Sequence, residues 1–329
     1  MSRVYEALRV KQQEAGDPHA GPAAVGTEDA DPASLHTDLG TAEEILAAMG
    51  TGEEPRVPTD FAPPINAPSS VPPAGRTASP NGFQRLKLVY REASRLVFQT
   101  DPDGLAAEQF RFLRRTLEHK FPNGAVLLIT SPAPKDGKTF TALNLSTCLA
   151  ESGRSTLMLE ADIRQPAARR VLGIKQAGSG IEETLAGTSA PDKVVYFVEA
   201  LSLHLAMVAE PPADPSRLIG GEGMRKLLAW ARTHFCWVVI DSPPVLPAAD
   251  VAELIPLANA VLLVVRAEST PRDLATRAFE LLGSHLSGVI LNEGTIQSNP
   301  YYRYLADYRQ KKSPLRRAES ASEDERSAG

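Results

Sequence analysis

A glycine, a lysine and a threonine follow one another in the stretch SPAPKDGKTFTALNLS (131–146). A short apolar run, 124–131, precedes them, and residues with helical spacing follow. In such a strand–loop–helix unit, backbone N–H groups and the helix N-terminus bind phosphate, the lysine reaches the β- and γ-phosphates, and the hydroxyl binds Mg²⁺. The stretch therefore predicts a phosphate loop with Gly137, Lys138 and Thr139 at its centre.

The loop departs from the usual G-x-x-x-x-G-K-[ST] pattern. Pro132 stands where the first glycine is expected, and Lys135 is a second departure from the glycine-rich form. A Gly-Lys-Thr sequence on a loop is common, so the motif alone leaves nucleotide binding open. The residues expected to line the nucleotide are Ala133, Pro134, Lys135, Asp136, Gly137, Lys138, Thr139 and Phe140.

Acidic residues end two other apolar runs. Glu160 and Asp162 are one residue apart and are expected on the same side of a strand end, and Arg164 has the same parity. A second run ends at Asp241, as a Mg²⁺-binding acid of a phosphate-loop protein requires. Acids at the carboxyl edge of a parallel sheet lie where such folds bind ligands, although a solvated strand end gives the same pattern.

Six apolar runs separated by helical stretches predict a doubly wound, mostly parallel α/β sheet of the P-loop NTPase class. The expected strands are 124–131, 155–162, 203–210, 235–244, 260–268 and 287–292. In this arrangement the phosphate loop and the acids share the carboxyl edge of the sheet.

Composition divides the chain into four parts. Residues 1–15 have the apolar spacing of a short helix, for which a docking role and a transient helix without a role remain open. Residues 16–83 are rich in proline and alanine and nearly free of aromatics, so we expect a disordered linker. Residues 84–297 form the expected α/β domain with the phosphate loop, and 298–329 form a tail with clustered tyrosines and a charged end.

Charge and cysteine content exclude some classes of protein. The net charge is −5, from 35 basic and 40 acidic residues, which gives no bias toward nucleic acid or an anionic membrane. Cys148 and Cys236 lie far apart in apolar contexts, which favours small core residues in a reducing compartment.

The longest apolar run, 260–265, is far below the roughly 20 residues of a membrane span, and the start of the sequence lacks a signal peptide's apolar stretch. We expect a cytoplasmic protein.

Together these motifs resemble the bacterial tyrosine kinases of capsule and exopolysaccharide synthesis, which are relatives of the MinD/ParA ATPases. The resemblance runs from about residue 100 to 310, and Ala133 stands where MinD-type proteins carry an additional lysine. The opening MSRVYEALRV is also similar to the start of soluble members whose transmembrane partner is a separate chain. The matching stretches are SPAPKDGKTFTALNL, LMLEADIRQP, GIEETLAG, EPPADPSRLI, VVIDSPPVLPAADV, VLLVVRAESTPRD and GVILN.

The resemblance implies a role for each matching residue of the nucleotide site. Lys138 matches the phosphate-binding lysine, and Asn292 matches an adenine contact. The implied Mg²⁺ ligands, direct or through water, are Thr139, Asp162 and Asp241.

The resemblance also implies catalytic roles at the end of the second strand. Arg164 matches the family's arginine in this motif. Glu160 stands where the family has an aspartate that helps to deprotonate the tyrosine, and its extra methylene extends the carboxylate by about 1.5 Å. The implied catalytic residues are Lys138, Glu160, Asp162 and Arg164.

The stretch EQFRFLR places Glu108, Arg111 and Arg114 three residues apart, so that they neighbour one another on a helix. Spacing alone favours an ordinary surface charge cluster. In the family, however, E-x-x-R-x-x-R packs subunits into a ring, so the resemblance implies a homo-oligomer interface.

Four of the seven tyrosines, Tyr301, Tyr302, Tyr304 and Tyr308, fall within eight residues of the tail. The resemblance implies an ATP- and Mg²⁺-dependent autokinase that phosphorylates this cluster in trans and regulates polysaccharide synthesis and export. The implied partners are other copies of the chain, a transmembrane chain-length protein as activator and a tyrosine phosphatase, at the inner face of the plasma membrane and without nucleic acid. A MinD/ParA-like ATPase switch and a weakly catalytic nucleotide-sensing regulator remain alternatives, and the tyrosine cluster favours the kinase.

Overall fold

The computed structural model describes residues 82–88, 96–174, 178–247 and 249–293. The expected N-terminal helix, all but the last two residues of the expected linker, and the tail with its four tyrosines lie outside these ranges.

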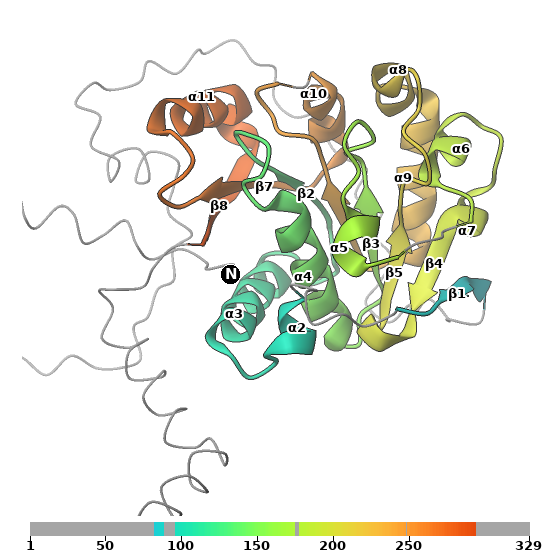
Figure 1. Ribbon diagram of the computed structural model, residues 1–329, viewed down its shortest axis with the longest axis horizontal. Coiled ribbons are helices and arrows are strands. Elements are labelled where there is room, and N and C mark those ends of the chain that lie inside the picture. The colour runs from blue at the N-terminus through green and yellow to red at the C-terminus, as the bar shows by residue number, and fades with distance from the viewer. Residues whose placement is uncertain (1–81, 89–95, 175–177, 248, 294–329) are drawn as a thin grey trace, which may run out of the picture.

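Within the described residues, eight strands form one sheet in the order β1-β4-β5-β3-β6-β2-β7-β8 (Figure 1). Neighbouring strands are parallel except β4 and β5, which are antiparallel. The strands are β1 (Gln84–Leu86), β2 (Val126–Thr130), β3 (Thr156–Glu160), β4 (Val195–Val198), β5 (Leu203–Ala206), β6 (Trp237–Asp241), β7 (Ala260–Arg266) and β8 (Leu286–Asn292). The expected mostly parallel α/β fold is confirmed.

Two of these strands, β1 and β4, were not expected from the sequence. Both are short, with three and four residues, and therefore carry little periodic signal. β4 directly follows a short helix and turns back onto β5 through residues 199–202. Such a tight return gives the antiparallel pair, whereas the other strands are joined by longer crossovers.

Helices cover both faces of the sheet, which explains why β2, β3, β5 and β6 are buried along their whole length. Apolar residues of α2–α5 pack in the core on one face, and those of α6–α11 pack on the other. The helices are α2 (Val97–Thr100), α3 (Leu105–Lys120), α4 (Lys138–Glu151), α5 (Ala168–Leu172), α6 (Ile181–Leu185), α7 (Pro191–Val194), α8 (Pro215–Ile219), α9 (Glu222–His234), α10 (Asp250–Leu254) and α11 (Arg272–Leu282).

The packed core begins one residue earlier than the sequence predicts. Phe83, the last residue of the expected linker, lies against His204, Trp230 and Phe235, with ring centroids 5.0, 6.3 and 5.9 Å away. The segment before β1 is thus tied to the sheet by an aromatic cluster.

No helix among the described residues combines the length and the apolar composition that crossing a membrane requires.

Candidate active site

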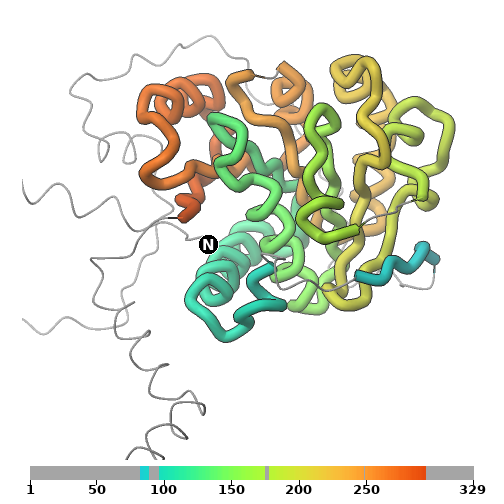
Figure 2. The backbone as a smooth tube through the Cα atoms, viewed as in Figure 1, coloured from blue at the N-terminus to red at the C-terminus, as the bar shows by residue number. Residues whose placement is uncertain are grey.

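The phosphate loop joins β2 to α4, and the tube in Figure 2 follows its path from strand to helix. Gly137 immediately precedes α4 with φ at 100°, and a Cβ built there would lie 2.0 Å from the Asn292 amide nitrogen. Only glycine combines this backbone conformation with such a close neighbour. Lys135 also adopts a left-handed conformation, with φ at 72°, at the cost that a side chain brings to this region.

Contacts from three parts of the chain brace the loop. The Asp136 carboxylate accepts hydrogen bonds from the Ala133 N–H at 3.0 Å and the Thr270 hydroxyl at 2.8 Å. The Asn292 side-chain amide donates to the Asp136 carbonyl at 2.9 Å. Side-chain hydrogen bonds therefore fix the conformation of this loop. In a glycine-rich loop, the glycines themselves allow the required backbone conformation. Asn292, the expected adenine contact, therefore touches the loop backbone, and its buried Oδ1 has no partner among the described residues.

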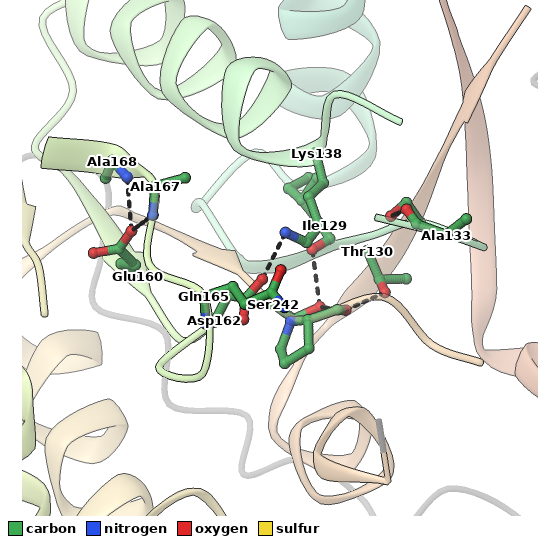
Figure 3. Close-up of polar contacts among 12 residues, drawn as sticks. Ile129, Thr130, Ala133, Lys138, Glu160, Asp162, Gln165, Ala167, Ala168 and Ser242 are labelled. Carbon is green, nitrogen blue, oxygen red and sulfur yellow. Dashed lines mark hydrogen bonds and ion pairs between the residues drawn. The ribbon is translucent and has the colours of Figure 1, made fainter. Parts of the chain in front are cut away.

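The opening of the loop is tied to the segment after β6. The Thr130 hydroxyl donates to the Pro243 carbonyl at 2.9 Å, and the Ser242 hydroxyl donates to the Ile129 carbonyl at 3.0 Å (Figure 3). The Val245 N–H donates to the Ser131 carbonyl at 2.8 Å. These bonds fix the end of β2, which leads into the loop, against the end of β6, which carries Asp241.

Lys138 forms an ion pair with Asp162, with 2.7 Å between Nζ and Oδ2, and both side chains are nearly buried (Figure 3). Burial acts to lower the pKa of Lys138, but the charges of Asp241, Asp162 and Glu160 more than offset it, so the pKa is raised. The lysine is thus fully protonated at neutral pH and lies at the first residue of α4, where a phosphate would bind.

Asp241 is completely buried at the end of β6, beside Ile129 of β2 and Glu160 of β3 in the sheet register. Burial raises its pKa to about 7, while Lys138 and the Thr139 hydroxyl act in the opposite direction. Neither carboxylate oxygen has a hydrogen bond of normal geometry from the described residues. A buried acid whose oxygens have no such partner is suited to bind a cation.

These residues fit a Mg²⁺ ion that is shared with a nucleotide. Mg²⁺ is usually held by one or two carboxylates and by substrate phosphates, with water in its remaining positions. Thr139, Asp162 and Asp241 offer one hydroxyl and two carboxylates beside the loop. Within the described ranges no group of three or more His, Cys, Asp or Glu residues is arranged to hold a metal by itself.

The structure does not place Glu160 and Asp162 on the same side, which corrects the parity argument. β3 ends at Glu160, and the N–H groups of Ala161 and Asp162 both donate to the Asp241 carbonyl, at 2.8 and 3.0 Å. Two consecutive N–H groups on one carbonyl break the alternation of a strand. The Asp162 carboxylate therefore lies beside Lys138, and that of Glu160 lies elsewhere (Figure 3).

The Glu160 carboxylate is completely buried and faces backbone N–H groups. It accepts from Ala167 and Ala168 at 2.7 Å each, and from Val208 at 3.0 Å. Burial raises the pKa of Glu160, and these hydrogen bonds act in the opposite direction. The base role expected for Glu160 thus has no support from the geometry of its carboxylate.

The Arg164 guanidinium pairs with Asp250. Its Nε donates to Asp250 Oδ2 at 2.7 Å, and the Ser216 hydroxyl donates to Asp250 Oδ1 at 2.7 Å. Burial acts to raise the pKa of Asp250, but Arg164 and Ser216 outweigh it, so the pKa is lowered. Neither Asp250 nor Ser216 was expected at the site from the sequence. The available signal was their location in two of the stretches that resemble the family.

The charged residues of α3 divide into two groups. Arg111 pairs with Glu108 at 2.5 Å and also donates to the Pro102 carbonyl at 2.8 Å. Arg114 turns toward α4 and donates to the Cys148 carbonyl at 3.0 Å. The structure brings Glu108 and Arg111 together on the surface, and the subunit interface stays a prediction.

No family model matches the chain. It is 29% identical over 236 residues to a putative tyrosine-protein kinase in the cps region of Klebsiella pneumoniae, which covers 69% of this chain and 32% of the relative. It is 28% identical over 214 residues to the tyrosine-protein kinase YwqD of Bacillus subtilis, which covers 64% of this chain and 90% of the relative. The chain thus spans less than two thirds of the Klebsiella relative and most of the Bacillus one.

Solved structures give the same result. The kinase domain of the Escherichia coli tyrosine kinase ETK is 27% identical, with a TM-score of 0.59 over 64% of this chain and 84% of that one. The kinase domain of VpsO is 30% identical, with a TM-score of 0.52 over 58% of this chain and all of that one. With its phosphate loop, its acids and this similarity, the chain belongs to the bacterial tyrosine-kinase family.

Proposed function

We propose that this protein is an ATP-dependent protein-tyrosine kinase that phosphorylates the tyrosine cluster of its own C-terminal segment. One observation carries the proposal: the 2.7 Å pair of Lys138 and Asp162 lies beside the buried Asp241 at the start of α4. That arrangement offers a cation for phosphate and acids for Mg²⁺ at a single sheet edge.

Lys138 exchanges its partner when nucleotide binds. Its ammonium moves from the Asp162 carboxylate to the β- and γ-phosphate oxygens, so an ion pair is replaced rather than lost. The Asp162 and Asp241 carboxylates and the Thr139 hydroxyl would hold the Mg²⁺, which would supply positive charge to neutralise the phosphates during transfer.

Transfer requires a tyrosine oxygen in line with the γ-phosphorus, about 3–3.5 Å away. A bond forms between the phenol oxygen and the γ-phosphorus, the bond to the bridging oxygen breaks, and ADP leaves. The phenol proton passes to solvent or to an acid of the site. The proposed acceptors, Tyr301, Tyr302, Tyr304 and Tyr308, lie outside the described residues.

We propose transfer in trans within a homo-oligomer whose contacts include Glu108, Arg111 and Arg114. Packing subunits together raises the effective concentration of a neighbour's tyrosines to roughly the millimolar range. A cluster with up to four phosphates, each about −1.5 to −2 charges, is then repelled by the acids of the site.

We further propose that the protein acts in capsule or exopolysaccharide synthesis and export, in support of which one relative is encoded in a cps region. Its proposed partners are a transmembrane chain-length protein that activates it at the inner face of the plasma membrane, and a tyrosine phosphatase that resets it.

A second function is a nucleotide-dependent regulator with little kinase activity, either an ATPase switch or a sensor. The hydrogen bonds of Glu160 to three backbone N–H groups favour it, because they occupy the side chain expected to act as base. The two functions differ in the acceptor, which is tyrosine for the kinase and water for the switch.

The deciding experiment incubates the purified full chain with Mg²⁺ and ATP labelled at the γ-position, followed by mass spectrometry of the C-terminal peptides. Phosphotyrosine in the wild type and none in Lys138→Met supports the kinase. Phosphate release without phosphotyrosine supports the switch.

A further inference from the structure

Glu160 joins two loops at the carboxyl edge of the sheet. Its Oε1 accepts from the N–H groups of Ala167 and Ala168, where α5 begins, each at 2.7 Å. Its Oε2 accepts from the N–H of Val208, just after β5, at 3.0 Å. The side chain has no exposed surface. One carboxylate thus fixes the end of the loop after β3 against the loop after β5.

We propose that Glu160 is a positioning residue: it holds the loop between β3 and α5 so that Asp162 faces Lys138 and the Mg²⁺ site, and it does not accept the tyrosine proton. This inference rests on the nucleotide site of the proposed function.

Hydrogen bonds close the loop that runs from Glu160 through Asp162 to Ala168. At its start, the N–H groups of Ala161 and Asp162 donate to the Asp241 carbonyl. In its middle, Asp162 Oδ1 accepts from the Gln165 N–H at 3.1 Å. At its end, the N–H groups of Ala167 and Ala168 donate to Glu160, the last residue of β3. Asp162 Oδ2 is thereby left facing Lys138.

The same bonds argue against a base at this position. A general base must bring a free lone pair within hydrogen-bond reach of the proton that it takes. Three of the four lone pairs of the Glu160 carboxylate accept from backbone N–H groups, and the side chain has no exposed surface. To reach a tyrosine, the carboxylate would have to leave those buried N–H groups without an acceptor.

Two substitutions of Glu160 separate the roles. Glu160→Asp keeps the charge but is about 1.5 Å shorter, so it cannot reach both loops. Glu160→Gln keeps the length and one acceptor oxygen for Ala167 and Ala168, and loses only the bond to Val208. Positioning therefore predicts that Asp is the more damaging change. A base role predicts the reverse, because only Asp retains a carboxylate.

The first readout is ADP binding to the full chain by calorimetry, with Mg²⁺ and with EDTA. We expect the Mg²⁺ enhancement of affinity to fall about tenfold or more in Glu160→Asp and less in Glu160→Gln, in the range typical of residues that orient metal ligands. General destabilisation would weaken binding with and without Mg²⁺ alike. Wild-type enhancement in both variants overturns the proposal.

The second readout is tyrosine phosphorylation at saturating Mg²⁺ and ATP. For positioning, we expect kcat of Glu160→Gln to stay within about tenfold of the wild type, whereas loss of a base costs about 100-fold to 10,000-fold. A loss of 100-fold or more with unchanged Mg²⁺-dependent binding overturns the proposal, as does a faster Glu160→Asp than Glu160→Gln.

Glu182→Gln is the matched control. Glu182 accepts from the N–H groups of Ala209 at 3.2 Å and Glu210 at 3.0 Å, in the loop that Glu160 reaches through Val208. These hydrogen bonds reach the loop after β5 and not the loop after β3, which carries Asp162. We therefore expect Mg²⁺ to enhance ADP affinity in Glu182→Gln as it does in the wild type. A loss equal to that of Glu160→Asp would overturn the proposal.

Two safeguards keep the test decisive. Thermal melting checks folding, and if Glu160→Asp does not fold, Glu160→Gln decides: a reduced Mg²⁺ enhancement supports positioning and an unchanged one overturns it. If the wild type forms no phosphotyrosine, the kinase proposal fails, while the Mg²⁺-dependent binding still decides the role of Glu160.

Discussion

Replacing the buried Asp241 by asparagine is expected to stabilise the protein in the absence of nucleotide and Mg²⁺. Burial raises the pKa of Asp241 from 3.8 to about 7. The folded protein therefore binds this proton more tightly than the unfolded chain does. The stability that Asp241 contributes is fully present below pH 3.8 and is lost as pH rises through 7.

The magnitude follows from the two pKa values. A difference of about three units corresponds to about 4 kcal/mol of stability lost at pH 8, which is an upper limit. The attraction of Lys138 is already contained in that pKa, since it acts to lower it. Asparagine leaves a buried polar group to be satisfied at this position, which offsets part of the gain. We therefore expect a net gain of about 2 kcal/mol at pH 8, which corresponds to about 4–8 °C in Tm for a domain of this size.

The assay is thermal melting of wild type, Asp241→Asn and Asp162→Asn in EDTA at pH 5 and pH 8. The advantage of Asp241→Asn should grow between the two pH values by about 2 kcal/mol, because Asp241 loses its proton in this range while Lys138 stays protonated. Asp162→Asn is the control, since it removes the direct partner of Lys138 and should lower the Tm. Adding Mg²⁺ and ADP should reverse the order in favour of the wild type. An advantage that does not change with pH would refute the reasoning.

Three further changes test other parts of the protein. Lys138→Met should reduce autophosphorylation at least about 100-fold, since it removes a preorganised cation, and unchanged phosphotyrosine by mass spectrometry would contradict the phosphate-loop assignment. Mixed with a chain that has an intact site but lacks the four tail tyrosines, the Lys138→Met chain should still become labelled, and absence of label would exclude transfer in trans. His204→Phe should flatten the acid side of the stability curve. Burial lowers the pKa of His204 to about 4, so the wild type loses up to about 3 kcal/mol as pH falls from 6.5 to 4; equal pH slopes in urea unfolding would contradict this. Reversing the charges of Glu108, Arg111 and Arg114 should shrink the unphosphorylated particle on light scattering, and an unchanged size would remove α3 from the interface.

Much of the sheet could be predicted because its central strands are long apolar runs that end in polar residues. The phosphate loop was recognisable from Gly137, Lys138 and Thr139 despite Pro132 at the usual first glycine. The hydrogen bonds that brace the loop were not, because Thr270 and Asn292 contact Asp136 across sequence separations of 134 and 156. Contacts over such separations leave no local pattern.

The roles after β3 were the least predictable part of the site. Parity requires a regular strand, and the bonds of Ala161 and Asp162 to one carbonyl end that regularity at Glu160. The partner of Arg164, Asp250, lies 86 residues further along the chain, so nothing near Arg164 shows this pairing.

The bond between Asn292 and the phosphate loop has a mechanical consequence. Asn292 is the last residue of β8, and the described fold ends one residue later at Glu293, whose carboxylate pairs with Arg266. A pull on the chain beyond Glu293 therefore acts on that ion pair, on the bond from the Ala267 N–H to the Asn292 carbonyl, and on the Asn292 amide, which donates to the Asp136 carbonyl beside Gly137. Tension on the C-terminal segment would act on the backbone that cradles phosphate through one side chain, so the end of the last strand works as a tension linkage to the nucleotide.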